Sequence, residues 1–223
     1  MKKVTLIGDC HSARIFEHYD PLNCPILFQA WGKGGTNAWN NDPKKMSEEK
    51  ALSTGTEEPS LYYSPKNNGA ISFEKIVNQD LILVWLGYVD IRQMLPGHKD
   101  AENCVKQYVK RFVEYFNESE VRFIEPLPQF IPILLKSPGL HPEYTYNERI
   151  EQNNEFIKFL KKYSNEYNLK PPISQEQIFK ALELSAEEMT EDKTRVNLNH
   201  PVDALKQEYM GKIYNLFLSE ASK

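Results

Sequence analysis

The most regular feature of the chain is a series of short apolar runs, each ending in a polar turn or at proline. Four runs have this form: Val4 to Ile7, Pro25 to Trp31, Asp80 to Val89 and Val121 to Glu125. The first run is apolar at successive rather than alternate positions, which is typical of a strand buried on both faces, as in a parallel sheet. We therefore predict four strands. The most apolar run, Asp80 to Val89, is the best candidate for the central strand.

Between and after these runs the apolar residues are spaced for one face of a helix. The clearest case is the set Val105, Tyr108, Val109, Phe112, Val113 and Phe116, which recur every three or four residues. Less regular versions of the pattern predict helices over residues 12–19, 147–168, 175–189 and 201–219, with Ser174 as the N-cap of the third. Residues 40–69 are mostly polar, so we expect a long surface excursion there, with a short helix near Lys45 to Leu52.

Strands and helices thus alternate along most of the chain. This order predicts an α/β fold of three layers, α/β/α, in which a central and mostly parallel sheet lies between helices, as in flavodoxin-like proteins. The length of 223 residues is enough for one domain with a full core and is short for two. We therefore expect a single domain over residues 1–223.

Composition and charge narrow the classes of function. Apolar residues make up 40% and charged residues 26%, and the net charge of −4 gives no general attraction to nucleic acid or to an anionic membrane. No stretch approaches the ~20 apolar residues of a membrane span, and the first apolar run is too short for a signal peptide. The 3 cysteines form no disulfide framework, and no Cys/His cluster has zinc-site spacing. We expect a cytoplasmic protein with reduced thiols, without a metal or cofactor and without a nucleic-acid or membrane partner.

The candidate chemistry lies where the predicted strands end. In an open α/β sheet, ligands bind beyond the carboxyl ends of the strands. Three predicted strands lead into polar turns, at Asp9 to Ser12, at Gly32 to Gly35 and at Gly87 to Arg92. If the strands are parallel, all three turns lie along one edge of the sheet, and this edge is the expected site.

Cys10 is the strongest candidate for a reactive side chain in the first turn. It stands between a strand end and a helix N-terminus, where backbone N–H groups and the helix dipole favour a thiolate. The alternative is a small thiol buried under the sheet, against which the polar neighbours Asp9, His11 and Ser12 argue. His11 either lowers the pKa of the thiol or caps the turn, and Ser12 is either a nucleophile or the N-cap of the next helix.

These turns resemble the sequence blocks of the SGNH/GDSL hydrolases, in the same order and over nearly the whole chain. Gly8-Asp9-Cys10 matches the Gly-Asp-Ser block, with cysteine in place of the nucleophilic serine, and Gly34 or Gly35 fits the glycine that donates an N–H to the oxyanion hole. Gly87-Tyr88-Val89-Asp90 matches the Gly-x-Asn-Asp block except that valine replaces the asparagine. Asn197-Leu198-Asn199-His200 matches the Asp-x-x-His block with asparagine in the first position.

The resemblance implies a Cys-His-Asn variant of the catalytic triad. In it Cys10 is the nucleophile, His200 transfers the proton and Asn197 orients His200. Without the resemblance, His200 is better explained as a capping residue at the start of the final helix.

The resemblance also implies an oxyanion hole at the same edge of the sheet. The N–H groups of Cys10 and of Gly34 or Gly35 would form it, and Arg92 or Asn37 would substitute for the missing side chain. Asp90 would either orient the turns of the site or cap the turn in which it lies.

The function that follows is hydrolysis of an acyl ester, carried by a small molecule or a carbohydrate. Two alternatives stay open. A polysaccharide-modifying acyltransferase branch with a Gly-Asn-Cys turn also looks similar, and the departures at Val89 and Asn197 suit a non-catalytic binding or structural protein of the same fold. A nucleotide-binding Rossmann domain fits less well, because Gly8-Asp9-Cys10 lacks the spaced glycines that approach a pyrophosphate. The sequence indicates no oligomeric state.

Overall fold

The structure is a computed structural model that describes residues 2–8, 12, 15, 18–19, 23–24, 26–32, 79–88, 90–91, 101–127, 146–190 and 206–223. The predicted excursion over residues 40–69, with its short helix, lies outside the described residues, as does most of the predicted helix over residues 12–19. Within that segment Ser12 and Ile15 are helical, and the N–H of His18 donates to the carbonyl of Ile15 at 3.1 Å.

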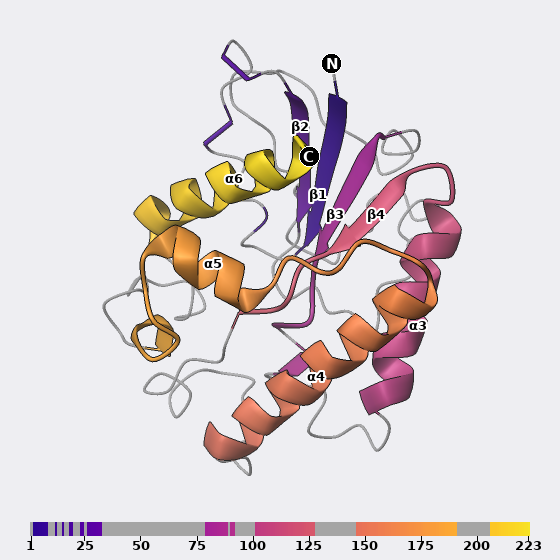
Figure 1. Cartoon of the computed structure of the whole chain (residues 1–223), viewed down its shortest axis with the longest axis vertical. Coiled ribbons are helices and arrows are strands. Elements are labelled where there is room, and N and C mark those ends of the chain that lie inside the picture. The colour runs from indigo at the N-terminus through magenta and orange to yellow at the C-terminus, as the bar shows by residue number, and fades with distance from the viewer. Residues whose placement is uncertain are drawn as a thin grey trace, which may run out of the picture.

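The four predicted strands form one parallel sheet (Figure 1). They are β1 (Lys2–Gly8), β2 (Ile26–Gly32), β3 (Leu81–Trp85) and β4 (Glu120–Phe123), in the order β2-β1-β3-β4. Each neighbouring pair is parallel, as the apolar runs predicted. β3 is shorter than its apolar run, because Gly87 turns the chain out of the sheet with φ of +110° while Leu86 and Tyr88 remain buried.

Four helices complete the described fold. They are α3 (Ala101–Tyr115), α4 (Tyr146–Glu166), α5 (Gln175–Leu182) and α6 (Gln207–Ala221), and a 3-10 turn, η5, covers Glu188–Thr190. All four were predicted, but α5 is shorter, since Glu183 adopts a left-handed conformation with φ of 58°. α6 begins later, because Lys206 is extended at its N-cap. None of the described helices has the length and apolar character needed to cross a membrane.

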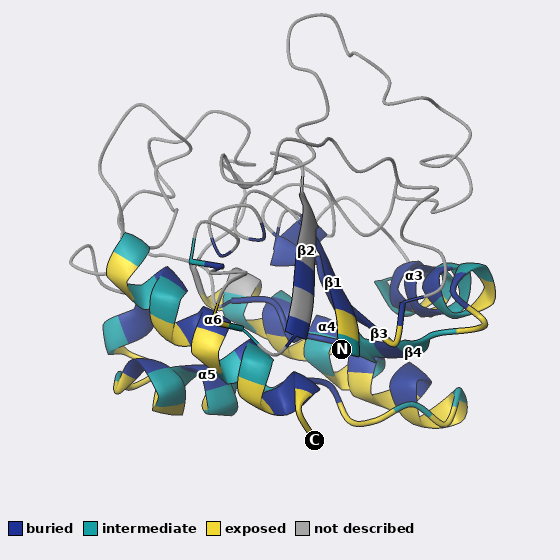
Figure 2. Cartoon of the chain, turned by 90° about the horizontal axis from the view of Figure 1, so that it is seen from above, coloured by how far each residue is buried: buried dark blue, intermediate teal, exposed yellow. Residues whose placement is uncertain are grey.

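The helices cover both faces of the sheet, as the three-layer prediction requires. Val4 and Leu6 of β1 join a buried cluster with residues of α5 and α6, whereas Ile7 joins a second cluster with residues of α3 and α4. Figure 2 shows the buried side of each helix turned toward the strands. Burying a large apolar side chain contributes ~1.5–3 kcal/mol, so these two clusters are the main source of stability.

Charged side chains fix the C-terminal end of α6 to the sheet. The Nη1 atom of Arg122 on β4 donates to Glu220 Oε2 at 2.8 Å, and Lys2 Nζ donates to the carbonyl of Ala221 at 2.6 Å. The Glu220 side chain is 6% exposed. Burial opposes its charge, yet hydrogen bonds from Lys223 and Arg122 hold the pKa of the Glu220 carboxyl below its usual range. The last turn of the chain is therefore held by ionic contacts as well as by apolar packing.

Candidate active site

Three strands end at the same level of the sheet. In the parallel register Gly8, the last residue of β1, pairs with Gly32, the last of β2, and with Trp85, the last of β3. The chain leaves each of these strands toward one of the three turns that the sequence singled out. The predicted convergence of the strand ends on one edge is confirmed, and in α/β folds this is the edge at which ligands bind.

The end of β1 is packed so closely that only glycine fits there. A Cβ atom on Gly8 would lie 2.0 Å from Ser12 Oγ and 2.6 Å from the carbonyl oxygen of Trp85. Ser12 is completely buried, and its hydroxyl has no hydrogen-bond partner among the described residues. Ser12 therefore turns its side chain onto the end of the sheet, which does not fit the alternative of a nucleophile open to substrate.

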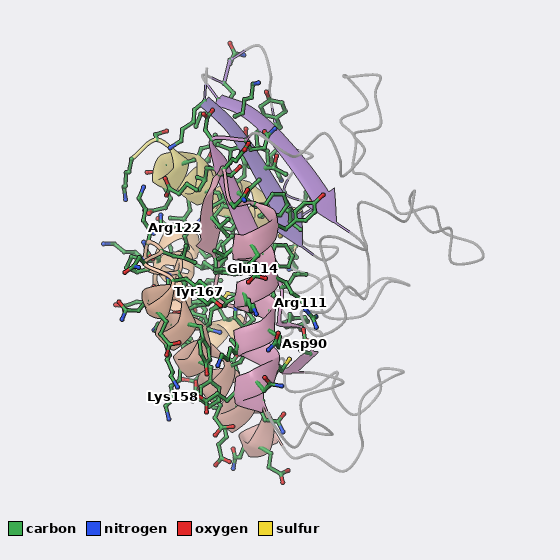
Figure 3. All side chains as sticks on the ribbon, turned by 90° about the vertical axis from the view of Figure 1, so that its right-hand side faces the viewer. Asp90, Arg111, Glu114, Arg122, Lys158 and Tyr167 are labelled. Atoms are coloured by element: carbon green, nitrogen blue, oxygen red, sulfur yellow. The ribbon has the colours of Figure 1, made fainter. Side chains whose placement is uncertain are left out.

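The turn after β3 is held against α4. Gly87 has a positive φ, and a Cβ atom on it would lie 2.6 Å from Cζ of Phe156. The N–H of Ile91 donates to the carbonyl of Gly87 at 3.0 Å, which closes the turn. Asp90 within it is completely buried, and in the view of Figure 3 it lies on the side of α3 that faces away from α4. The aspartate of the predicted third block is thus part of a closed, buried turn.

The other predicted site residues lie outside the described part of the chain. They are Asp9, Cys10, His11, Gly34, Gly35, Arg92, Asn197 and His200, together with the candidate substitute Asn37 and the departure at Val89. The structure brings together the strand ends next to three of the four blocks. The roles of these side chains remain predictions.

Next to the strand ends the structure places a buried carboxylate, Glu125, that the sequence did not single out. Glu125 follows β4 and is 3% exposed, with Oε1 3.0 Å from Lys161 Nζ. Its Oε2 accepts a hydrogen bond from the N–H of Gln175, the first residue of α5, at 2.8 Å, and its backbone carbonyl accepts one from Trp85 Nε1 at 3.2 Å. A carboxylate at a helix N-terminus is stabilised by the helix dipole. Glu125 therefore joins the ends of β3 and β4 to α4 and α5.

A lone glutamate at the end of an apolar run is an ordinary surface pattern, so no sequence signal marked Glu125. Within the described ranges, no group of three or more His, Cys, Asp or Glu side chains is arranged to hold a metal ion.

Comparison with known proteins gives matches by structure. No protein-family model and no curated protein matches the sequence. An acetyl xylan esterase is 17% identical with a TM-score of 0.57, and the match covers 98% of each chain. A lipase/acylhydrolase from Enterococcus faecalis is 14% identical with a TM-score of 0.58, over 99% of this chain and 95% of that one. The psychrotrophic esterase EstA from Pseudoalteromonas sp. is 12% identical with a TM-score of 0.57, over 100% of both chains. At these identities the likeness is one of fold.

Proposed function

Because the chain has an SGNH/GDSL hydrolase-like fold, we propose that it is a thiol-dependent acyl-ester hydrolase. The observation that carries the proposal is the shared level at which β1, β2 and β3 end, with Gly8 opposite both Gly32 and Trp85. Cys10 follows Gly8 by two positions, and the glycines proposed for the oxyanion hole follow Gly32 within three. A nucleophile and the N–H groups that stabilise an oxyanion are needed close together, and this register supports that arrangement.

In the proposed reaction His200 takes the proton of the Cys10 thiol, and the resulting thiolate attacks the ester carbonyl and forms a C–S bond. The negative charge moves to the carbonyl oxygen, where the N–H groups of Cys10 and of Gly34 or Gly35 stabilise it. As the C–O bond of the ester breaks, His200 gives its proton to the departing alcohol. Water, deprotonated by His200, then attacks the thioester, releasing a carboxylic acid and the thiol. The side-chain oxygen of Asn197 accepts the second ring N–H of His200 and fixes its tautomer.

The proposed substrates are short acyl esters, including acetylated carbohydrates. The names of the structural neighbours support this class, since they include an acetyl xylan esterase and acylhydrolases. A thioester on Cys10 could also pass its acyl group to a sugar hydroxyl in place of water, which gives the acyltransferase alternative. The two outcomes share every step up to the thioester and differ only in the acceptor.

The experiment is hydrolysis of p-nitrophenyl acetate by the wild type and by Cys10→Ala, Cys10→Ser and His200→Ala. We expect Cys10→Ala and His200→Ala to lose at least ~10²-fold in kcat, and Cys10→Ser to keep partial activity, because serine is the nucleophile of the resembled block. Cys24→Ser is the matched control, since Cys24 is a free cysteine outside the proposed machinery.

Equal rates for the wild type and Cys10→Ala would refute the mechanism. The non-catalytic alternative is favoured if the chain shows no ester turnover and iodoacetamide alkylates Cys10 no faster than a model thiol.

A further inference from the structure

His18 makes a polar and a steric contact with the first turns of α6. Its Nε2 atom lies 3.2 Å from the backbone oxygen of Gln207, the first residue of the helix, and 3.1 Å from the side-chain nitrogen of the same residue. A Cβ atom on Gly211, one turn further along, would lie 3.1 Å from Cε1 of the His18 ring. The imidazole ring therefore rests on the backbone of α6 at the point where the helix begins.

The first turn of α6 follows an N-cap residue whose side chain does not cap it. Lys206 occupies the N-cap and makes no side-chain capping hydrogen bond. The middle and the end of the helix are anchored differently, by buried side chains such as Ile213 and Phe217 and by the ion pair of Glu220. The contact with His18 thus acts at a helix start whose N-cap residue makes no side-chain capping hydrogen bond.

A side chain at position 211 would crowd the ring of His18, since its Cβ would lie 3.1 Å from Cε1. Glycine inside a helix costs about 1 kcal/mol relative to alanine. The neighbouring positions Met210 and Ile213 are fully buried, so the helix cannot turn away from the ring without disturbing the core. The glycine weakens the helix locally and lets the imidazole approach its backbone.

The contact joins the two parts of the chain that carry the proposed catalytic pair. His18 ends the short segment that begins at Cys10, and Gln207 follows His200 after a short stretch of chain. We infer that His18 is a positioning residue that sets the start of α6 relative to the Cys10 segment, and through it the placement of His200. The inference rests on the proposed function. A misplacement of about 1 Å between reacting groups can cost up to ~10²-fold in rate, so a modest shift of the helix start would be seen in kcat.

The test compares His18→Ala, His18→Gln and Gly211→Ala with the wild type, using kcat and KM for p-nitrophenyl acetate and the rate of Cys10 alkylation at neutral pH. We expect His18→Ala to lower kcat roughly tenfold with KM nearly unchanged. His18→Gln should recover most of the loss, because its amide can donate to the Gln207 carbonyl. Gly211→Ala should lower kcat without lowering Tm, since alanine favours the helix while its methyl group displaces the ring.

The matched control is Tyr214→Phe, which removes the contact of the Tyr214 hydroxyl with Cys24 Sγ at 3.9 Å, farther along the same helix. It should leave kcat unchanged. If hydrolysis depends on Cys10 and folded His18→Ala keeps the wild-type kcat, the positioning role is wrong while the proposed function stands. If kcat falls only in proportion to the folded fraction, or Tyr214→Phe lowers it equally, His18 is merely structural. If the wild type and Cys10→Ala hydrolyse the ester equally, the proposed function fails and the positioning role falls with it.

Discussion

Replacement of Gly8 by alanine tests how tightly the strand ends are packed at the candidate site. The added Cβ would lie 2.0 Å from Ser12 Oγ and 2.6 Å from the carbonyl oxygen of Trp85, well inside the ~3.5–4.0 Å of an optimal contact between carbon atoms. Overpacking a well-filled position costs ~1–3 kcal/mol. One of the two crowded atoms, the Trp85 carbonyl oxygen, belongs to the backbone and cannot move aside as a side chain can. We therefore expect Gly8→Ala to lower the free energy of unfolding by about 3 kcal/mol. Urea unfolding followed by circular dichroism measures the loss.

The same geometry predicts how much a second substitution can recover. Ser12→Ala alone should be nearly neutral, because it removes a buried hydroxyl without a partner among the described residues. In Gly8→Ala/Ser12→Ala the contact with Oγ is gone but the Trp85 carbonyl remains, so we expect the double variant to recover about 1–2 kcal/mol of the loss, which is the coupling energy of the pair.

Two results would refute this reasoning. A Gly8→Ala protein within about 0.5 kcal/mol of the wild type, the usual range of a surface substitution, would show that the strand end is not close-packed. Full recovery in the double variant would show that the Trp85 carbonyl does not limit the space.

Three further predictions concern the framework around the site. Gly87→Ala should destabilise by about 3 kcal/mol in urea unfolding, since alanine is strained at φ of +110° and its methyl group would meet Phe156; a neutral variant would contradict this. Glu220→Gln should cost about 1.5–3 kcal/mol at pH 7, because it removes the charge that accepts from Arg122. The pKa of Glu220 is lowered in the folded state, so the loss of unfolding free energy in Glu220→Gln should be complete at neutral pH and should shrink as the pH falls through that pKa. A loss of unfolding free energy that does not change with pH would contradict this. Ser174→Ala should cost about 1 kcal/mol by removing one half of the capping box at α5, and an unchanged urea midpoint would count against the cap.

The elements of the fold followed from local physics that the sequence carries. Buried parallel strands need apolar side chains on both faces, so β3 stood out as a continuous apolar run, whereas Gln29 in β2 and Arg122 in β4 interrupt theirs. The capping residue Ser174 was also readable, because serine is a preferred N-cap residue. The structure adds its partner Gln177, which completes a capping box.

The errors arose where tertiary contacts overrode the pattern. The apolar residues after Trp85 looked like more strand, but they are buried in a turn that Gly87 makes possible. The predicted helix after Ser174 continued to Met189, yet the chain leaves the helix at Glu183 through a left-handed residue that no glycine announces.

The candidate site was predictable in position more than in detail. A parallel sheet forces its strand ends onto one edge, so the location followed from the strands alone. The close packing of Ser12 on Gly8 depends on distances across the sheet, which spacing along the chain does not encode. The same holds for Glu125, whose contacts with Lys161 and Gln175 come from two helices distant in sequence.

The central claim is that an acyl group passes through Cys10, and the most direct test is to trap that intermediate. The protein is mixed with p-nitrophenyl acetate, quenched in acid within the first turnover and digested, and the peptides are examined by mass spectrometry. We expect one acetyl group per chain, on the peptide that contains Cys10, formed at the same rate as a burst of p-nitrophenol. A His200→Ala chain that acylates but deacylates slowly should carry the acetyl group for longer than the wild type. Two results would contradict an acyl-Cys10 intermediate. One is ester turnover without an acetyl group on Cys10 in either the wild type or His200→Ala. The other is an acetyl group on a different residue, in an amount that Cys10→Ala does not change.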